Sequence, residues 1–291
     1  MNKGPFSLAQ SQITIVGLGL MGGSLALAVR AAHPGVQLAG VDTDPAVLAA
    51  AQARGLIDRA VSAADAHNCD LLVLATPVRA ILAQLDDLSR SYVPARQTVV
   101  LDLGSTKSDI VRAMAELPPR FEPIGGHPMC GKEAGGLAQA DPDLFREKVF
   151  VICPPGHISV RALGLVYDLI GAIGAKPLML SANRHDTLAA LVSHLPYAAA
   201  VALMRAVLAQ ADPQAWDLAA SGFRDTSRLA ASDLAMMTDI LVTNREAVLA
   251  ALNTYQDELA ALKAVIAQGD AESIRAALAP AQAKRAELFQ G

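Results

Sequence analysis

The sequence predicts an α/β domain with a doubly wound parallel sheet, followed by an all-helical domain. Two observations support this prediction. Short apolar runs alternate with helix-forming segments as far as about residue 180, which is the spacing of strands and crossover helices in a parallel sheet. From Asn183 to Glu287 the sequence keeps a helical period, is rich in alanine and contains no convincing strand. We therefore expect two domains, spanning residues 1–180 and 181–291.

The composition is compatible with this division and excludes some partners. The chain of 291 residues is long enough for two domains, and its hydrophobic content of 53% can fill a large core. The net charge of −4 gives the chain no general attraction for nucleic acid or for an anionic membrane. An anionic ligand would therefore need a local cluster of arginine or lysine.

The cysteines and the N-terminus indicate a cytoplasmic setting. Cys69, Cys130 and Cys153 show no Cys-x-x-Cys spacing, so we expect neither a disulfide framework nor a zinc site. The first twelve residues lack a basic segment followed by an apolar one, and no apolar run approaches membrane-spanning length. We expect a cytoplasmic protein with no metal, no membrane and no nucleic acid among its partners.

The first element is a strand over Ile13–Val16 that runs into a Gly-x-Gly-x-x-Gly turn, and a helix follows from Ser24. This strand, turn and helix are the dinucleotide-binding arrangement of a Rossmann domain. One glycine permits the tight turn, the next lets a pyrophosphate approach the backbone, and the third lets the helix pack closely. The N–H groups at the helix N-terminus then face the phosphates. The residues expected to bind the cofactor here are Gly17, Gly19, Leu20, Met21 and Gly22.

A second apolar run, Val36–Val41, ends in Asp42, twenty residues after Gly22. An acid at this distance is expected to hold the ribose hydroxyls of the adenosine. It would repel the 2′-phosphate of NADP, and the nearest following basic residue is Arg54, so the sequence favours NAD. The alternative is a glycine turn without a ligand, in which Asp42 caps the helix that begins at Pro45.

The remaining elements follow in order, and Thr76 and Pro77, at the end of one strand, are also expected to contact the cofactor. Strands are predicted over Leu71–Ala75, Val99–Leu103, Phe121–Ile124, Val149–Cys153 and Lys176–Leu180. Helices are predicted over Pro45–Arg54, Val78–Leu88, from about Ser108 to Glu116, and over Val160–Ile173. The helical domain is expected to begin with a long helix that carries His185, His194 and Pro196.

His127 is the strongest candidate for chemistry. It stands between Gly125-Gly126 and Pro128, just after a predicted strand. Pro128 favours an extended backbone at His127, and the carboxyl ends of the strands form the ligand crevice of an open α/β sheet. A histidine there could take the proton of an alcohol as hydride leaves its carbon. The alternative is a loop histidine that hydrogen-bonds to the backbone.

The loop after the preceding strand contains two further candidates. Ser105 could bridge the substrate hydroxyl and the nicotinamide, or it could cap the helix that begins near Ser108. Lys107 is expected to be a solvated residue of the first helical turn or an adjunct to the cofactor site.

In the helical domain, Arg224 and Arg228 lie in a Gly- and Ser-containing stretch. Arg228 could bind a carboxylate through two hydrogen bonds, whereas a salt bridge with Asp225 or Asp233 is expected for Arg224. His194 precedes Pro196 within a helix, where the proline frees backbone groups. It is either a substrate ligand or a core histidine that those groups satisfy.

These motifs together resemble the prephenate/arogenate dehydrogenase (TyrA) family, and the resemblance runs from Ile13 to the final helices. The segments that carry it are Gly17–Ser24, Asp102–Lys107, Gly125–Gly131, Ser193–Pro196 and Gly222–Arg228. The glycine turn is common to many dehydrogenases, but the His-Pro and Gly-Phe-Arg-Asp motifs in this order are specific. The resemblance implies oxidative decarboxylation of prephenate to 4-hydroxyphenylpyruvate, or of arogenate to tyrosine, with hydride transfer to NAD⁺.

The resemblance also implies roles for individual residues. His127 matches the histidine that accepts the proton of the ring hydroxyl, and Ser105 matches a serine that bridges this hydroxyl and the nicotinamide. Arg228 matches the arginine that binds a substrate carboxylate, and His194 matches a histidine of the same pocket. Glu133 matches an acidic residue at the pocket mouth. The helical domains of this family usually intertwine, which implies a homodimer.

Two alternatives share part of this pattern. A β-hydroxyacid-type NAD dehydrogenase shares the glycine turn but would use a lysine on the long helix after the first domain, where this chain has Asn183, His185 and His194. A non-catalytic NAD-binding regulatory protein would need only the cofactor half, so His127, Ser105 and Arg228 count against it. The sequence does not decide between prephenate and arogenate.

Overall fold

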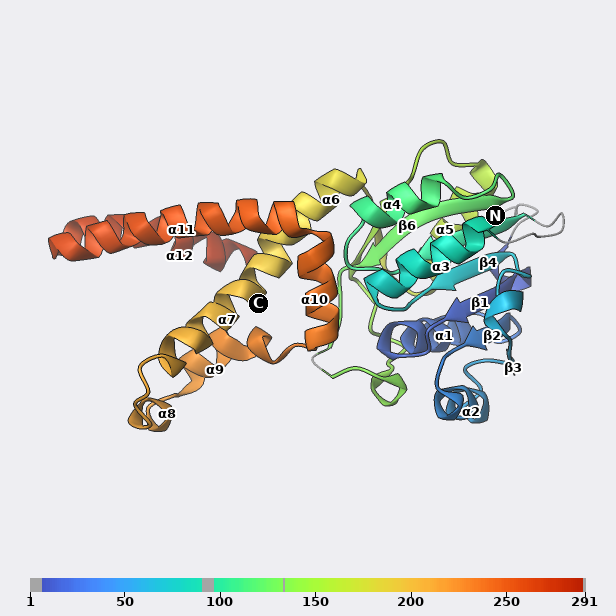
Figure 1. Ribbon diagram of the computed structural model, residues 1–291, viewed down its shortest axis with the longest axis horizontal. Coiled ribbons are helices and arrows are strands. Elements are labelled where there is room, and N and C mark those ends of the chain that lie inside the picture. The colour runs from blue at the N-terminus through green and yellow to red at the C-terminus, as the bar shows by residue number, and fades with distance from the viewer. Residues whose placement is uncertain (1–6, 91–96, 133, 290–291) are drawn as a thin grey trace. The chain divides into compact units, whose positions relative to one another are not determined.

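The computed structural model describes residues 7–90, 97–132 and 134–289. The chain divides into two compact units, Met1–Arg245 and Glu246–Gly291. The first unit contains an eight-stranded sheet in the order β3-β2-β1-β4-β5-β6-β7-β8 (Figure 1). The strands are β1 (Gln12–Val16), β2 (Gln37–Val41), β3 (Arg59–Ala60), β4 (Leu71–Leu74), β5 (Thr98–Asp102), β6 (Phe121–Pro128), β7 (Val149–Cys153) and β8 (Lys176–Met179).

The predicted parallel sheet is confirmed, with two differences. All neighbouring strands are parallel except β6 and β7, which are antiparallel. The two-residue strand β3 was not predicted, because Arg59 and Ala60 are exposed and carry no apolar pattern. The most central strands, β4 and β5, are buried along their whole length. Continuous burial explains why these strands are apolar and do not alternate with polar residues, apart from Thr98 and Asp102 at the two ends of β5, whose polar groups are hydrogen-bonded inside the protein.

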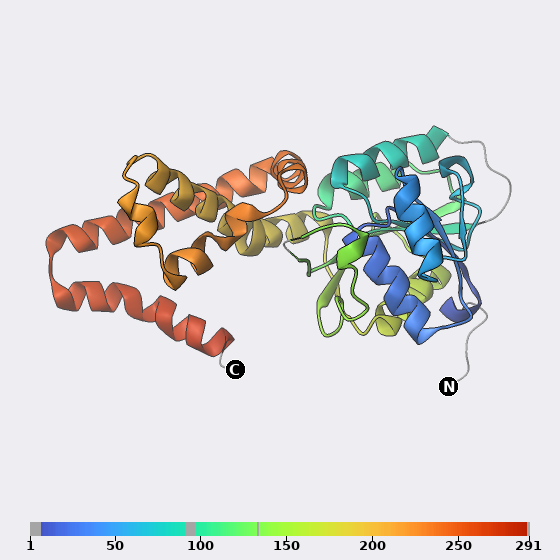
Figure 2. The same ribbon diagram turned by 90° about the horizontal axis from the view of Figure 1, so that it is seen from below.

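Helices cover both faces of the sheet. On one face, α3 (Val78–Arg90) and α4 (Ser108–Ala115) lie side by side (Figure 1) and pack on Leu72, Leu74 and Val100. On the other face, α1 (Leu20–Ala32) and α5 (Val160–Ala172) pack together (Figure 2) over Ile15, Val73 and Leu101. Short 3₁₀ turns complete this part of the chain: η1 (Leu8–Gln10), η2 (Ala63–Asp65) and η3 (Leu137–Gln139).

The start of α2 (Pro45–Ala53) separates two predictions about Asp42. The carboxylate of Asp44, and not that of Asp42, accepts the N–H of Ala46 at 2.8 Å and so caps this helix. Pro45 occupies the first helical position, where its missing N–H costs nothing. Asp42 is therefore not needed as a cap.

The helical part of the first unit begins with one continuous helix. Its segments are α6 (Ala182–Ala189), the π-helical turn η4 (Ala190–His194) and α7 (Leu195–Leu208). Pro196 lacks a backbone N–H, so the regular hydrogen-bond pattern is broken one turn earlier, where the π turn forms. The segments that follow are α8 (Gln214–Asp217), α9 (Ser221–Ser227), η5 (Arg228–Ala231) and α10 (Leu234–Thr243).

This continuous helix corrects one expectation about apolar length. By length and composition alone, Ala182–Leu208 passes the test for a membrane-crossing helix, with a mean hydropathy of 1.6. A core helix of a soluble protein has the same length and composition. A long helix was expected here, but its mean hydropathy over a membrane-spanning length was not.

The second unit consists of α11 (Arg245–Gln268) and α12 (Ala271–Leu288). Gly269, with φ +68°, turns the chain between them, and Asp270 caps α12 by accepting the N–H of Ser273 at 2.8 Å. No residue of α12 is buried. The expected domain boundary at residues 180 and 181 stays a prediction, and the compact unit that contains the sheet extends to Arg245.

Candidate active site

The glycine turn after β1 has a shape that requires glycine at two of its three positions. Gly17 has φ +88°, and a Cβ there would lie 2.9 Å from the carbonyl oxygen of Ala75. A Cβ at Gly22 would lie 1.9 Å from the carbonyl oxygen of Gly17, which no small shift could relieve. Gly19 differs, because a Cβ there would meet nothing within 4 Å. Its α carbon therefore faces open space at the point where α1 begins.

The N-terminus of α1 is suited to a phosphate. Gly19 is its N-cap residue and makes no side-chain capping bond, so the first N–H groups of the 13-residue helix remain available. Leu20 and Gly22 are buried and Met21 is half-buried, so these residues contribute their backbone and not an exposed side chain. Backbone N–H groups and the positive end of the helix dipole bind anions. The turn thus fits the pyrophosphate of a dinucleotide.

Asp42 lies beside this turn, at the end of β2. Its carboxylate accepts the N–H of Leu18 at 2.8 Å and the N–H of Asp44 at 3.0 Å, so its position is fixed. A cavity of about 690 Å³ opens next to it. Five of the predicted cofactor residues line this cavity together: Gly17, Gly19, Asp42, Thr76 and Pro77. The lining fits the adenosine half of a dinucleotide, with an acid placed for ribose hydroxyls and apolar side chains around it.

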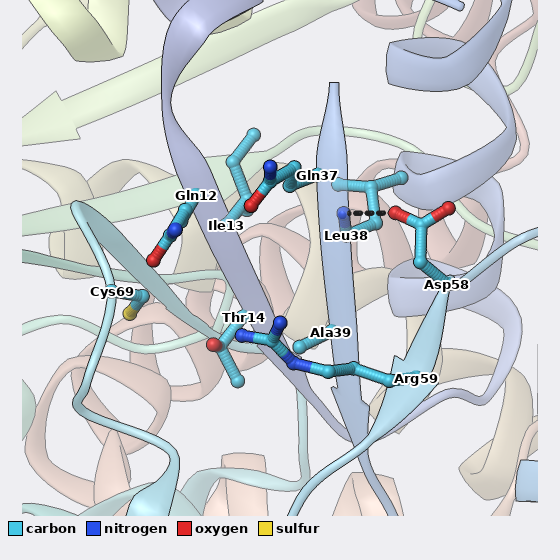
Figure 3. Close-up of a pocket in the computed structure, with 9 residues that line it drawn as sticks. All are labelled: Gln12, Ile13, Thr14, Gln37, Leu38, Ala39, Asp58, Arg59 and Cys69. Atoms are coloured by element: carbon cyan, nitrogen blue, oxygen red, sulfur yellow. Dashed lines mark hydrogen bonds between the residues drawn. The ribbon is translucent and has the colours of Figure 1, made fainter. Parts of the chain in front are cut away.

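A smaller cavity of about 300 Å³ lies at the other end of the strands. Figure 3 shows Gln12, Thr14 and Arg59 around it, and Asp58 accepting the N–H of Leu38 at 2.7 Å. These residues belong to the amino-terminal halves of β1 and β2 and to the start of β3. No predicted site residue lines this cavity, which agrees with the rule that ligands bind at the carboxyl ends of parallel strands.

His127 lies inside β6, so the prediction that it follows the strand in a loop was wrong. The first half of β6 pairs with β5, and its second half pairs with β7, where His127 is opposite Val151. The two preceding glycines explain why the strand continues. A Cβ at Gly126 would lie 2.6 Å from the carbonyl oxygen of Asp102, and one at Gly125 would lie 2.7 Å from that of Cys153. Only glycine lets the strand pass between these neighbours.

A chain of polar side chains begins at His127. Its Nδ1 lies 2.7 Å from Nε2 of His185 in α6, and the two rings meet edge to face. Nδ1 of His185 lies 2.8 Å from Oδ1 of Asp186. Asp186 also accepts the N–H groups of Lys107, at 2.7 Å, and Ser108, at 2.8 Å. Asp186 therefore caps α4 from another segment of the chain, and Ser105 does not cap it.

The environment sets the charge of these groups. Burial lowers the pKa of His127 well below its usual value, and the neighbouring His185, Lys107 and His194 lower it further. His127 is therefore neutral at pH 7. Burial alone would raise the pKa of Asp186, but hydrogen bonds from His185, Ser108 and Lys107 outweigh it and lower this pKa. Asp186 is therefore a carboxylate.

Lys107 is fully buried, so the expectation of a solvated lysine was wrong. Its Nζ forms an ion pair with the buried carboxylate of Asp102 and donates to the carbonyl oxygen of Gly126 at 2.8 Å. Asp102 also accepts the N–H groups of Gly104, at 2.8 Å, and Gly126, at 3.0 Å. This pair fixes the loop after β5 to the segment that carries His127. The sequence signal for it is an acid at the end of a buried strand with a lysine five residues later.

His194 is the last residue of the π turn, and its side chain is buried. Its Nδ1 lies 3.2 Å from Nδ2 of Asn244, which also donates to the carbonyl oxygen of Asp186 at 2.8 Å. Burial lowers the pKa of His194 to about 4, and His185 lowers it too, whereas Asp186 acts in the opposite direction. The partner of His194 is thus a side chain, and not one of the backbone groups that Pro196 frees.

The other candidates are placed as follows. Ser105 is half-buried after β5, and its hydroxyl makes no hydrogen bond to any residue in the described ranges. Arg228 is exposed at the start of η5, which packs on α7. Arg224 forms the expected ion pair with Asp225, at 3.2 Å. Glu133 lies outside the described residues.

The carboxyl ends of neighbouring strands bring these features to one edge of the sheet. The glycine turn follows β1, Thr76 follows β4, Ser105 follows β5, and His127 lies near the end of β6. These four strands are neighbours in that order. A dinucleotide site beside a neutral histidine at such an edge defines a dinucleotide-dependent dehydrogenase.

Comparison with known proteins specifies the family. Residues 25–179 match the profile described as prephenate dehydrogenase, nucleotide-binding domain, and residues 181–280 match that described as prephenate dehydrogenase, dimerization domain. The chain belongs to the prephenate dehydrogenase family. The predicted family resemblance, the NAD cofactor and the assignment to NAD-dependent prephenate/arogenate dehydrogenases are thereby confirmed.

Individual relatives agree with this assignment. The prephenate dehydrogenase of Bacillus subtilis is 32% identical over 267 residues, which cover 90% of this chain and 72% of that protein. The cyclohexadienyl dehydrogenase of Zymomonas mobilis is 30% identical and covers 89% of this chain and 90% of its own length. The Aquifex aeolicus prephenate dehydrogenase structure with hydroxyphenyl propionate and NAD⁺ superposes with a TM-score of 0.90, at 30% identity, over 97% of this chain and 100% of that one.

The β-hydroxyacid alternative is related in fold alone. The 3-hydroxyisobutyrate dehydrogenase of Salmonella typhimurium superposes with a TM-score of 0.54 at 18% identity, over 84% of this chain and 88% of that one.

Synechocystis arogenate dehydrogenase superposes with a TM-score of 0.81 at 29% identity, over 96% of this chain and 100% of that one.

Proposed function

We propose that this protein oxidatively decarboxylates prephenate or arogenate with NAD⁺, and that His127 accepts the proton of the ring hydroxyl. The observation that carries this proposal is the neutral His127 at the carboxyl end of β6, on the edge of the sheet that also carries the glycine turn. NAD⁺, when bound, accepts the hydride that leaves the ring carbon. The turn Gly17–Gly22 and Asp42 would hold its pyrophosphate and adenosine ribose.

His127 acts on the proton in this reaction. A neutral imidazole takes the hydroxyl proton while the C–H bond of the same carbon breaks, and the ring becomes a dienone. The bond to the ring carboxylate then breaks, CO₂ leaves, and its electron pair moves through the ring to the carbonyl oxygen. The resulting phenolate recovers the proton from the imidazolium of His127. Aromatisation drives this second step.

Ser105 and His194 complete the proposed reacting centre. Ser105 follows β5, which lies between β1 and β6 in the sheet, and the lack of a hydrogen-bond partner for its hydroxyl among the described residues leaves it available to the substrate hydroxyl. His194, buried beside the His185–Asp186 pair, is proposed to face the same pocket. Glu133 is proposed to stand at the pocket mouth.

The reaction is tested by following NAD⁺ reduction with prephenate and with arogenate, each also with NADP⁺. Turnover with NAD⁺ and either substrate is expected, and the ratio of the two kcat/KM values names the preferred one. Because Asp42 faces the ribose, activity with NADP⁺ should be far lower. Measurable NAD⁺ binding without turnover on either substrate would overturn the proposal.

Arg228 is proposed to bind a carboxylate of the substrate. A charged hydrogen bond contributes about 1.5–3 kcal/mol, so R228A should raise KM about 10- to 100-fold with a smaller change in kcat. The matched control is R224A, because Arg224 already pairs with Asp225. An unchanged KM in R228A, or an equal rise in R224A, would remove Arg228 from this role.

We also propose that the protein is a homodimer through its helical part and works in the cytoplasm. Large apolar side chains are exposed on these helices, and a match to a dimerization domain covers them. In the first unit they include Leu208, Leu234 and Val242, and in the second Leu259, Ile266 and Leu278. Such exposure favours contact with a second chain. Sedimentation equilibrium should give twice the chain mass, and a monomer at all concentrations would contradict the proposal.

A further inference from the structure

His127 has one ring nitrogen inside the protein and one without a partner among the described residues. Nδ1 contacts Nε2 of His185 at 2.7 Å, whereas Nε2 of His127 makes no hydrogen bond there. A neutral imidazole carries its proton on only one of these nitrogens. A base must present a free lone pair to the substrate. The position of the proton therefore decides whether His127 can act, and the proposed function requires it to be on Nδ1.

The neighbouring groups fix this choice in three steps. Asp186 is a carboxylate and only accepts hydrogen bonds, so Nδ1 of His185, at 2.8 Å, must carry a proton. A neutral His185 then has its lone pair on Nε2. That nitrogen accepts the proton of Nδ1 of His127, which leaves the lone pair of His127 on Nε2. The alternative, in which His185 is protonated on both nitrogens, would make His127 a donor at Nε2 and abolish its function as a base.

Asp186 is itself held in one orientation. Oδ1 accepts the N–H of Lys107 and Oδ2 accepts that of Ser108, at the start of α4. His185 and Asp186 are 2% and 3% exposed, so water does not compete for these bonds. Their backbone position is also fixed, because Asn244 donates to the carbonyl oxygen of Asp186 at 2.8 Å. The ring of His185 therefore has a defined orientation before the substrate binds.

From this geometry we infer that His185, oriented by Asp186, is a positioning residue that keeps the proton of His127 on Nδ1 and its lone pair on Nε2. The inference rests on the proposed function only for its effect on rate. When His127 takes the substrate proton, both of its nitrogens carry protons, and Nδ1 continues to donate to His185. The carboxylate of Asp186, on the far side of His185, then stabilises the positive charge. His185 does not take up this proton. It therefore remains on His127 and can return to the product.

Two variants of His185 separate orientation from simple packing. H185L removes the acceptor nitrogen and fills the buried site with an apolar side chain. H185Q keeps a carbonyl oxygen that can accept the proton of Nδ1 of His127. Loss of an orienting hydrogen bond commonly costs about 10- to 100-fold in activity, so we expect kcat of H185L to fall by this factor with KM changed less than about threefold. H185Q should recover most of the loss. Variants of Asp186 are unsuitable because Asp186 also caps α4.

The control for loosening of the same segments is T243V. The hydroxyls of Thr106 and Thr243 lie 2.8 Å apart and join the loop after β5 to α10. T243V removes this hydrogen bond, keeps the side-chain volume and does not touch His127. Its kcat should stay within about twofold of the wild-type value. A fall in T243V equal to that in H185L would mean that general loosening, and not orientation, explains the loss, and would overturn the inference.

A second measurement needs no substrate. In protein labelled with ¹⁵N-histidine, two-bond ¹H–¹⁵N correlation spectra distinguish a protonated Nδ1 from a protonated Nε2. We expect the Nδ1–H form for His127 in the wild type and in H185Q, and a shift to the Nε2–H form or to a mixture in H185L. The H127N spectrum assigns the signal. An Nε2–H form in the wild type, or an unchanged form in H185L, would overturn the inference. Wild-type protein inactive on both substrates would overturn the proposed function, whereas the spectra would still test the positioning.

Discussion

The cofactor turn and the histidine cluster are built in different ways. The turn after β1 is local: ten consecutive residues form the strand end, the glycine turn and the first turn of α1, and backbone atoms are proposed to do most of the binding. The cluster draws His127 from β6, Lys107 from the loop after β5, and His185 and Asp186 from α6. Binding by backbone atoms requires open space and suitable φ angles, whereas catalysis by side chains from distant segments requires the right protonation states and charges. The two regions should therefore fail in different ways.

The largest expected effect is that of H127N. Loss of a general base commonly costs about 10² to 10⁴ in rate, so kcat should fall by this factor. The glycine turn and Asp42 are untouched, so the Kd for NADH, measured by fluorescence titration, should remain within about twofold of the wild-type value. Near-normal turnover would remove His127 from its role. Weakened NADH binding would show that the two regions are coupled and would contradict the comparison.

The histidine cluster also makes stability depend on pH. Burial holds the pKa of His194 at about 4 in the folded protein, against about 6.5 when unfolded. Between these values the unfolded chain binds a proton that the folded protein does not bind, so the free energy of unfolding falls as the pH is lowered from about 6.5 to 4. The contribution is fully present above pH 6.5 and amounts to roughly 3 kcal/mol.

The measurement is urea denaturation at several pH values, for the wild type and for H194Q. The difference between the two free energies of unfolding should shrink steadily as the pH falls from about 6.5 toward 4. His127, whose pKa is also lowered, contributes with the same sign in both proteins, and because burial is the main cause and His194 the smallest, most of this contribution cancels in the difference. A constant difference across this range would show that His194 titrates normally in the folded state.

The same contrast explains what the sequence could predict. The turn, Asp42 and the parallel strands were predicted because a short segment with a characteristic residue spacing determines each of them. Asp44 at the start of α2 follows the ordinary preferences for a helix N-cap. The burial of Lys107 was missed for two reasons. Its ion-pair partner Asp102 lies on the other side of a turn, and the residue that contacts its backbone, Asp186, belongs to the distant helix α6. His185 and Asp186 gave no local signal, since their role appears only when α6 reaches the start of α4.

His127 shows both sides of this limit. Its residue type and its neighbours Gly125, Gly126 and Pro128 marked it as a candidate. Its place within a strand was missed, because Gly-Gly-His-Pro carries no strand propensity and forms a strand only through pairing with β7. The inferred tautomer of His127 could not be predicted from the sequence at all, since it depends on the spatial order of His127, His185 and Asp186.

The smallest effects come from the glycine turn, where two alanine variants sharpen the comparison. In G22A the new methyl group would lie 1.9 Å from the carbonyl oxygen of Gly17, so the turn must distort. Overpacking of this kind costs about 1–3 kcal/mol, and we expect a lower Tm together with weaker NADH binding. In G19A the methyl group would meet no protein atom within 4 Å, and φ −73° at this position suits any residue. Its Tm should therefore equal that of the wild type.

G19A should nevertheless bind NADH about 10- to 100-fold more weakly, because the methyl group fills the space through which the pyrophosphate reaches the backbone. Thermal denaturation without cofactor and fluorescence titration with NADH measure the two effects separately. If G19A binds NADH normally, the open side of Gly19 does not face the phosphates and the dinucleotide lies elsewhere in the cavity. If G19A loses stability instead, the turn is packed more tightly than its geometry indicates. A site made of backbone is thus recognised by a variant that changes affinity alone, whereas in the histidine cluster H127N should change kcat alone.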